Sequence, residues 1–282
     1  MILRILDTPA GEGFVAQTAS YRRSMKDHVE RYPGLIGILE KTTSPQNEMR
    51  LYNIHMKSGF RQLEYSFMLD HIPDHKPLHI LDMGSGVTVF PQTLARMGHY
   101  VEAMDPCSNW VLRDPDIQGS FNAFYGTDVE YRHQYAEEIG EARRYDLITS
   151  VSVLEHLYRR QVAGTIRHLL SLIKPWGRLI LTVDYAPHPV TTPSNPRHRL
   201  FKLKNRLTRL TYDLAFSQAE VISLILKNLP EKADIDDLRK QSRMATPYRD
   251  FWTSHMYNGC LHDGNLQYLP LGICCTVPGE YQ

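Results

Sequence analysis

The chain has 282 residues, of which 42% are hydrophobic and 22% are charged, as in an ordinary soluble globular protein. Its 32 lysines and arginines nearly balance 31 aspartates and glutamates, which leaves a formal net charge of +1. These values exclude a disordered chain and a global field that would attract nucleic acid, so DNA is not an expected partner. The length suits one large α/β domain with additions, or two small domains.

The first residues, Met1–Leu6, are apolar but too short for a signal sequence or a membrane span. No later run approaches the roughly 18 uncharged apolar residues that a span requires. Four cysteines form no CxxC pair and match no zinc or disulfide spacing, so we expect reduced, buried thiols: Cys107, Cys260, Cys274 and Cys275. The sequence therefore predicts a cytoplasmic protein without a membrane span.

Residues 14–72 are predicted to be mostly helical. Apolar residues such as Phe60, Leu63, Phe67, Met68 and Ile72 recur there at helical spacing. Pro73 and Pro77 close the region. We expect residues 1–77 to form an N-terminal helical cap.

From Leu78 onward, short apolar runs alternate with helical stretches, a pattern typical of βαβ units. The predicted strands are Leu78–Asp82, Tyr100–Asp105, Glu130–Gln134, Tyr145–Ser150 and Arg178–Asp184. The predicted helices are Val89–Met97, Asn109–Leu112, Leu154–Tyr158 and Val162–Ile173, and Lys174–Gly177 is predicted to be a turn. We expect residues 78–282 to form one doubly wound, mostly parallel seven-stranded sheet with helices on both faces.

The fifth predicted strand is followed by an insertion at residues 185–215. It contains a proline-rich stretch, Ala186–Pro196, and a basic stretch without acidic residues, Arg197–Arg209. The basic stretch is either a solvated face over an apolar stripe or an arm that contacts a phosphate-bearing acceptor or an anionic membrane surface. An amphipathic helix over residues 217–229 and a final strand, Leu269–Val277, are expected to complete the domain.

The segment Leu78–Gly86 (LHILDMGSG) is an apolar run that leads into a glycine turn. Such a turn either only reverses the chain or lets a nucleotide-like ligand approach the backbone. Asp105 ends the next apolar run, 23 positions after Asp82, close to the spacing at which a carboxylate meets ribose hydroxyls. Val89 occupies the place of the third glycine of a dinucleotide fingerprint, and Asp82 would repel a pyrophosphate but attract an ammonium group.

These motifs, together with Tyr145–His156 (YDLITSVSVLEH) and Lys174–Ile180 (KPWGRLI), resemble those of the class I S-adenosylmethionine-dependent methyltransferases over residues 78–184. The resemblance implies S-adenosylmethionine as cofactor and S-adenosylhomocysteine as product. It implies that the cofactor is bound by Asp82, Gly84, Ser85, Gly86, Asp105, Pro106 and Ser150, with Tyr135, Ala136 and Glu137 flanking the adenine. The sequence departs from the family pattern at Thr88, where a glycine is common, and at Tyr135, where an acidic residue is common.

Catalytic groups are marked less clearly than the cofactor, because methyl transfer needs mainly alignment, with a base where the acceptor is a hydroxyl. Asp184, Tyr185 and His188 are candidate bases or residues that only shape the loop, and His156 is either a base or a packed histidine. No metal site is expected, since His255, His262 and Asp263 match no ligand spacing.

The sequence therefore predicts methyl transfer to a small-molecule acceptor, preferably a hydroxyl of a sugar or related metabolite. Tyr212–Ser217 and the following helix resemble the substrate side of small-molecule methyltransferases. A nitrogen acceptor and a noncatalytic binding or scaffold protein of the same fold are the alternatives. An NAD-dependent oxidoreductase is disfavoured by Asp82 and Val89. Nothing in the sequence indicates the oligomeric state.

Overall fold

A computed structural model describes most of the predicted sheet domain. The described residues are 1–6, 59–74, 77–86, 88, 90–106, 122–123, 125–140, 144–186, 215–244, 261–262, 265–266 and 269–279. The basic stretch 197–209, the short helix expected at 109–112 and the helical region before residue 59 lie outside these ranges, as do Cys107 and Cys260.

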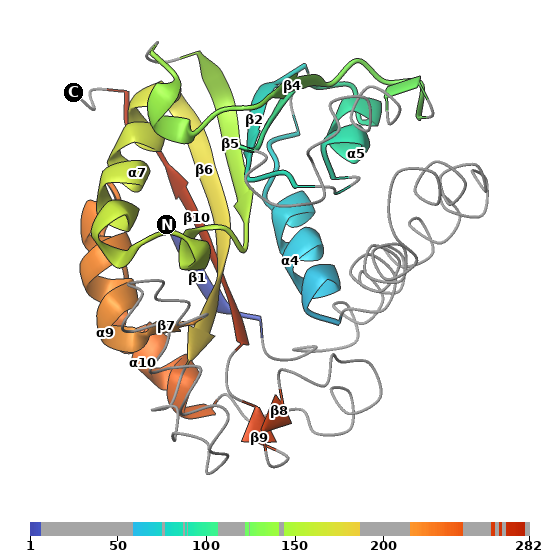
Figure 1. The fold of residues 1–282 in the computed structure, drawn as a ribbon. Helices are drawn as coiled ribbons and strands as arrows, with labels where there is room; N and C mark the ends of the chain where they lie inside the picture. The colour runs from blue at the N-terminus through green and yellow to red at the C-terminus, as the bar shows by residue number, and fades with distance from the viewer. Residues whose placement is uncertain are drawn as a thin grey trace.

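The core of the molecule is one large sheet (Figure 1). Seven strands follow the order β1-β10-β6-β5-β2-β3-β4, and an eighth, β7, pairs with β6 beside this path. Their bounds are β1 Ile2–Ile5, β2 His79–Met83, β3 Tyr100–Met104, β4 Glu130–Arg132, β5 Tyr145–Val151, β6 Ile173–Ala186, β7 Phe216–Ser217 and β10 Leu269–Thr276. The predicted mostly parallel α/β sheet is confirmed. The described sheet has eight strands rather than seven, and neither β1 nor β7 was predicted as a strand.

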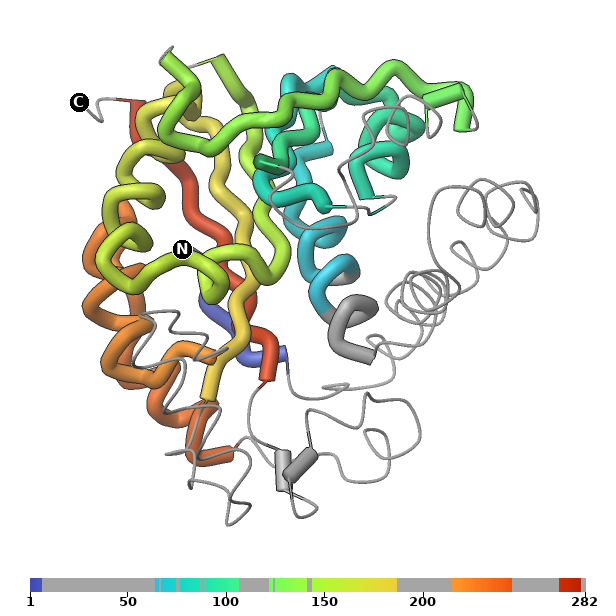
Figure 2. Tube along the Cα trace, viewed as in Figure 1, coloured from blue at the N-terminus to red at the C-terminus, as the bar shows by residue number. Residues whose placement is uncertain are grey.

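The N-terminal strand β1 belongs to the sheet, although the sequence analysis placed residues 1–77 in a helical cap. It pairs antiparallel with β10, and β10 pairs antiparallel with β6, so β1 runs in the same direction as the parallel strands. Figure 2 shows the first and last strands side by side. Ile5 and Leu6 are buried, which explains why this short apolar run stays in the sheet.

Helices cover both faces of the sheet, as predicted. On one side lie α4 (Gly59–Asp70) and α5 (Phe90–Arg96), and on the other α7 (Arg159–Leu172), α9 (Gln218–Glu220) and α10 (Ile235–Met244). Helix α4 contacts β10, β5 and β6, while α7 packs on β6 and α10 on β1. Helix α10 was not predicted. No helix in the described part of the chain is long and apolar enough to cross a membrane.

Three predicted local elements differ in type. Lys174–Gly177 is not a turn but a bulge within β6, because the register passes from Tyr145↔Ile173 to Leu147↔Arg178. The helix expected at 154–158 is a 3-10 helix, η3 (Leu154–His156). The helix expected at 217–229 starts at α9 with a Ser217–Glu220 capping box and continues as a π-helix, η4 (Val221–Ile225), and a 3-10 helix, η5 (Leu226–Asn228).

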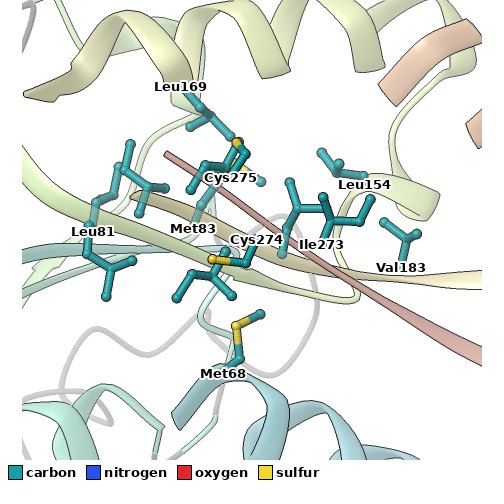
Figure 3. Packing of buried hydrophobic residues seen from close by; sticks show 14 of the residues in the cluster. Met68, Leu81, Met83, Leu154, Leu169, Val183, Ile273, Cys274 and Cys275 are labelled. Atoms are coloured by element: carbon teal, nitrogen blue, oxygen red, sulfur yellow. The ribbon is translucent and has the colours of Figure 1, made fainter. Parts of the chain in front are cut away.

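Buried side chains fill both interfaces between the sheet and its helices. In Figure 3, Cys274 of β10 lies toward Met68 of α4, and Cys275 lies toward Leu169 of α7. Both cysteines are free and buried, and burial raises the pKa of the Cys275 thiol to about 12, so these two thiols pack as small apolar groups. Gly272 allows α4 to approach the sheet, because a Cβ there would lie 2.7 Å from the Phe67 ring.

Outside the large sheet, β8 (Leu261–His262) pairs with β9 (Asn265–Leu266) in a separate two-stranded sheet.

Candidate functional site

The glycine turn follows β2 directly, at the carboxyl edge of the sheet. Gly84 and Ser85 donate their backbone N–H groups to the Met104 carbonyl at 2.7 and 3.1 Å. Gly84 has φ +71° and Gly86 has φ +52°, values that favour glycine. A Cβ on Gly84 would lie 2.3 Å from Val153 Cγ2, so this position also lacks room for a side chain.

Asp82, the last acidic residue before the turn, is buried with 3% of its surface exposed. Thr149 of the neighbouring strand β5 donates its hydroxyl to Asp82 Oδ1 at 2.7 Å. Burial raises the pKa of Asp82 to about 7; the Thr149 hydrogen bond opposes this shift and the nearby Asp105 charge adds to it. Within the described residues no salt bridge to Asp82 is formed.

Asp105 lies on the other side of the turn, one residue after β3. Its Oδ2 accepts a hydrogen bond from Gly86 N at 3.2 Å, and its own N–H donates to the Arg132 carbonyl at 3.0 Å. The next residue, Pro106, is partly buried. The structure thus brings Asp82, the glycine turn and Asp105 together at one place, where adjacent parallel strands of an α/β sheet end.

Two buried hydroxyls lie at the same strand ends. Ser85, in the turn, and Ser150, in β5, are 3% and 0% exposed, and neither Oγ has a hydrogen-bond partner among the described residues. Leaving such groups without a partner costs free energy, so they are suited to bind a polar ligand.

Tyr135, Ala136 and Glu137 fall at the 3-10 helix η2 (Ala136–Glu138) after β4. Tyr135 is 52% exposed and Ala136 is buried. Glu137 accepts a hydrogen bond from Thr165 Oγ1 of α7 at 2.6 Å, so its carboxylate is engaged with that helix. Their contact with an adenine ring stays a prediction.

The candidate bases have different surroundings. His156, in η3, is exposed. Asp184, near the end of β6, is partly buried, and its backbone N–H donates to the buried carboxylate of Glu155 at 3.3 Å. His188 lies outside the described residues. The neighbouring Tyr185 is fully buried and its hydroxyl is 2.6 Å from Ser242 Oγ, so it has a packing role.

Glu64 of α4 and its partner Thr182 were not predicted as site residues from the sequence. The Glu64 carboxylate is 1% exposed and accepts hydrogen bonds from the hydroxyls of Ser152 and Thr182. One sequence signal was present: Glu64 precedes the buried Phe67 and Met68 by three and four positions, so an acidic residue interrupts an apolar helical stripe.

No group of three or more histidine, cysteine, aspartate or glutamate side chains that could hold a metal occurs in the part of the chain that the structure describes. His255 and Asp263 lie outside that part, and the side chain of His262 is not described.

Comparisons with known proteins show the family of the chain. Residues 52–262 match the family model described as "Methyltransferase domain". Among curated relatives, the chain is 34% identical over 101 residues to the ubiquinone biosynthesis O-methyltransferase of Methylocella silvestris, covering 36% of this chain and 37% of that protein. It is 28% identical over 123 residues to the human mitochondrial ubiquinone biosynthesis O-methyltransferase, covering 41% of this chain and 32% of that protein. The chain therefore spans about a third of the length of these relatives.

Among solved structures, one that the chain matches is an S-adenosylmethionine-dependent methyltransferase from Mesorhizobium loti. It covers 76% of this chain and 97% of its own, with 14% sequence identity and a TM-score of 0.48.

Proposed function

This chain belongs to the family of S-adenosylmethionine-dependent methyltransferases, and on that premise we propose that it transfers a methyl group from this cofactor to a hydroxyl oxygen of a small molecule. The observation that carries the proposal is the glycine turn with the carboxylates of Asp82 and Asp105 on either side. An oxygen acceptor is supported by the curated relatives, which are named O-methyltransferases.

The residues at the turn fit this cofactor. A buried carboxylate with a pKa raised to about 7 and no salt bridge within the described chain is suited to an ammonium ligand, which would favour its ionised form. Asp105 carries carboxylate oxygens that can accept hydrogen bonds from ribose hydroxyls, and the Ser85 hydroxyl can donate to a ligand carboxylate. When bound, the cofactor supplies an electrophilic methyl group on a sulfonium.

The Asp82 carboxylate disfavours a dinucleotide as the ligand of the turn. Asp82 lies directly before the turn that would hold a pyrophosphate, and two like charges in a buried site repel each other. Calorimetry with S-adenosylmethionine, S-adenosylhomocysteine and NAD separates these ligands. We expect both sulfur compounds to bind and NAD not to bind; binding of neither sulfur compound would refute the proposal.

The acceptor is tested by release of S-adenosylhomocysteine over a panel of sugars, polyols, phenols and amines. Turnover with a hydroxyl compound is the expected result, and a sugar or related metabolite is our proposed class. Turnover only with amines would replace the oxygen acceptor with nitrogen, and cofactor binding without any turnover would favour a noncatalytic binding protein.

We further propose that Asp184 accepts the proton of the acceptor hydroxyl. It is partly buried near the carboxyl end of β6, two strands from β2 and four residues beyond Ile180, the β6 residue level with Asp82 in the register. Asp184 therefore lies about 10 Å across the sheet and about 13 Å along the strand direction from Asp82. Because general-base catalysis contributes roughly 10²- to 10⁴-fold, Asp184→Asn should lower kcat by that range while the Kd of S-adenosylhomocysteine stays unchanged. His156→Ala, at an exposed side chain, should have little effect. Wild-type turnover by Asp184→Asn would refute this role and leave the transfer itself intact.

Tyr185 and Ala186 belong to β6, so we propose that the inserted segment after them forms a lid over the acceptor, with Arg197–Arg209 contacting an anionic group. Turnover of a phosphate-bearing acceptor should then fall steeply with salt, while turnover of its neutral analogue should not. Equal salt sensitivity of the two acceptors would contradict this contact.

A further inference from the structure

A buried carboxylate links helix α4 to the strand ends at the carboxyl edge of the sheet. Glu64 accepts a hydrogen bond from Thr182 Oγ1 of β6 at 2.7 Å and another from Ser152 Oγ, one residue after β5. Since Glu64 is 1% exposed and Thr182 is fully buried, water does not replace these bonds without opening the core. One carboxylate therefore fixes three elements relative to one another.

Ser152 has an unfavourable backbone conformation. Its φ of +52° lies in the left-handed region, which is strained for a residue other than glycine. Its N–H donates to the Thr182 carbonyl at 3.1 Å and its hydroxyl donates to Glu64, so both polar groups of Ser152 hold it in this conformation. Strained residues persist where the surroundings determine them in this way.

The next residue, Val153, links Ser152 to the glycine turn by packing. Its Cγ2 lies 2.3 Å from where a Cβ of Gly84 would be, so Val153 packs directly against the backbone of the turn. The conformation of Ser152 determines where Val153 lies. Contacts thus run from Glu64 through Ser152 and Val153 to Gly84.

We propose that Glu64 is a positioning residue for the cofactor site: it holds Ser152 in its left-handed conformation, and so keeps Val153 against the turn that binds S-adenosylmethionine. This inference rests on the proposed function of that turn. It differs from a purely structural role, because a buried carboxylate that only stabilised the fold would change the free energy of unfolding without changing cofactor affinity.

The test measures the Kd of S-adenosylhomocysteine by calorimetry and the Tm of the same variants. Glu64→Ala should weaken binding by roughly 5- to 50-fold, whereas Glu64→Gln, whose carbonyl oxygen can accept both hydroxyl protons, should stay within about threefold of wild type. Adding Ser152→Gly to Glu64→Ala should restore most of the affinity, because glycine adopts a positive φ without the Glu64 bond.

A matched control is Ser242→Ala, which removes a buried hydroxyl of α10 that bonds to Tyr185. It should lower Tm without changing Kd. Glu64→Ala with a lowered Tm and a wild-type Kd, or a double variant that stays as weak as Glu64→Ala, would overturn the inference alone. Failure of the wild-type protein to bind S-adenosylhomocysteine would overturn the proposed function and, with it, this inference.

Discussion

Two buried carboxylates on adjacent strands have pKa values that are shifted in opposite directions. Asp82 of β2 and Glu102 of β3 are 3% and 4% exposed. The pKa of Asp82 is raised to about 7, whereas the pKa of Glu102 is lowered to about 2. Burial pushes both values upward, so the difference comes from the partners that the chain supplies.

Glu102 has partners on three strands and their flanks. His79 Nε2 lies 2.9 Å from Glu102 Oε1, and Arg132 Nε lies 2.7 Å from Oε2. The Tyr145 hydroxyl donates to Oε2 at 2.8 Å, and the Arg144 guanidinium contacts the same oxygen. These hydrogen bonds and charges outweigh burial. In the described part of the chain no cation plays this role for Asp82.

Glu102 also borders a hollow of about 680 Å³, lined by residues such as Pro77, Tyr100, Asp128 and Lys174. These residues lie where β2, β3, β4 and β5 begin, at the opposite edge of the sheet from the glycine turn. Charged groups there pair with one another, whereas the Asp82 carboxylate at the other edge has no ion pair within the described chain. Within the described chain, the missing counter-charge of Asp82 is what distinguishes the edge proposed to bind the ligand from the charge-paired edge.

The substitution expected to change ligand affinity most is Gly84→Ala, in the glycine turn at the edge proposed to bind the ligand. The new Cβ would clash with Val153, and φ +71° is strained for alanine, so we expect the affinity for S-adenosylhomocysteine to fall roughly a hundredfold or more. Calorimetry measures the change.

The matched control is Gly126→Ala, at φ +60° with no atom within 4 Å of its Cβ. This substitution strains the backbone to a similar degree without a steric clash, so the affinity of the variant for S-adenosylhomocysteine should stay close to that of the wild type. Equal losses for Gly84→Ala and Gly126→Ala would show that the turn has no special relation to the ligand.

A smaller effect should follow from the protonation of Asp82. With a pKa of about 7 the carboxyl holds its proton below neutral pH, and an ammonium ligand prefers the ionised form. The affinity for S-adenosylhomocysteine should therefore rise roughly tenfold from pH 6 to pH 7.5, with proton release on binding. Calorimetry in buffers with different ionisation enthalpies measures that release.

Asp82→Asn should remove this pH dependence and bind about as weakly as wild type does at pH 5.5. Asp146→Asn, which loses an ion pair with Lys174 at the other edge, should keep the wild-type profile. A pH-independent wild-type affinity would contradict the assignment of Asp82 to the ammonium group.

The part of the site that was predictable from sequence is the part encoded locally. The stretch that holds the apolar run of β2, the glycines and the two aspartates is about 25 residues long. The structure brings these residues together as expected. Glu64 and Thr182 are 118 positions apart, and no local pattern links them. The partners of Glu102 likewise come from β2, β4 and β5, so the opposite pKa shifts of two similar acidic residues could not be foreseen.

Fold details were missed for a related reason. Proline and glycine in Lys174–Gly177 indicate a break in regular structure, but whether the break is a turn or a bulge depends on the pairing of neighbouring strands. Likewise, Met1–Leu6 is too short to be recognised as a strand, and only its pairing with β10 determines its place in the sheet.

The smallest expected effect on ligand binding comes from a substitution at Glu102, at the edge of the sheet where the parallel strands begin. Glu102→Gln leaves Arg144 without this counter-charge and Arg132 with only the exposed Glu130, so the free energy of unfolding at pH 7 should fall by about 1–3 kcal/mol. The Kd of S-adenosylhomocysteine should stay within twofold of wild type. Glu130→Gln, whose side chain is 60% exposed and pairs with Arg132, is the control, and it should cost about 0–1 kcal/mol.

The pH dependence of stability separates the two carboxylates further. Because the folded-state pKa of Glu102 is below its ordinary value of 4.5, its stabilisation is present above pH 4.5 and is lost as the pH falls toward 2. Asp82 has the opposite sign: between pH 4 and 7 the folded chain binds a proton that the unfolded chain does not, so stability falls as the pH rises. Urea unfolding should show that Glu102→Gln flattens the acid limb and Asp82→Asn flattens the decline toward neutral pH. If Glu102→Gln flattened the decline toward neutral pH, or Asp82→Asn flattened the acid limb, the two carboxylates would not be independent. That result would contradict the division of the sheet into a charge-paired edge and a ligand-binding edge.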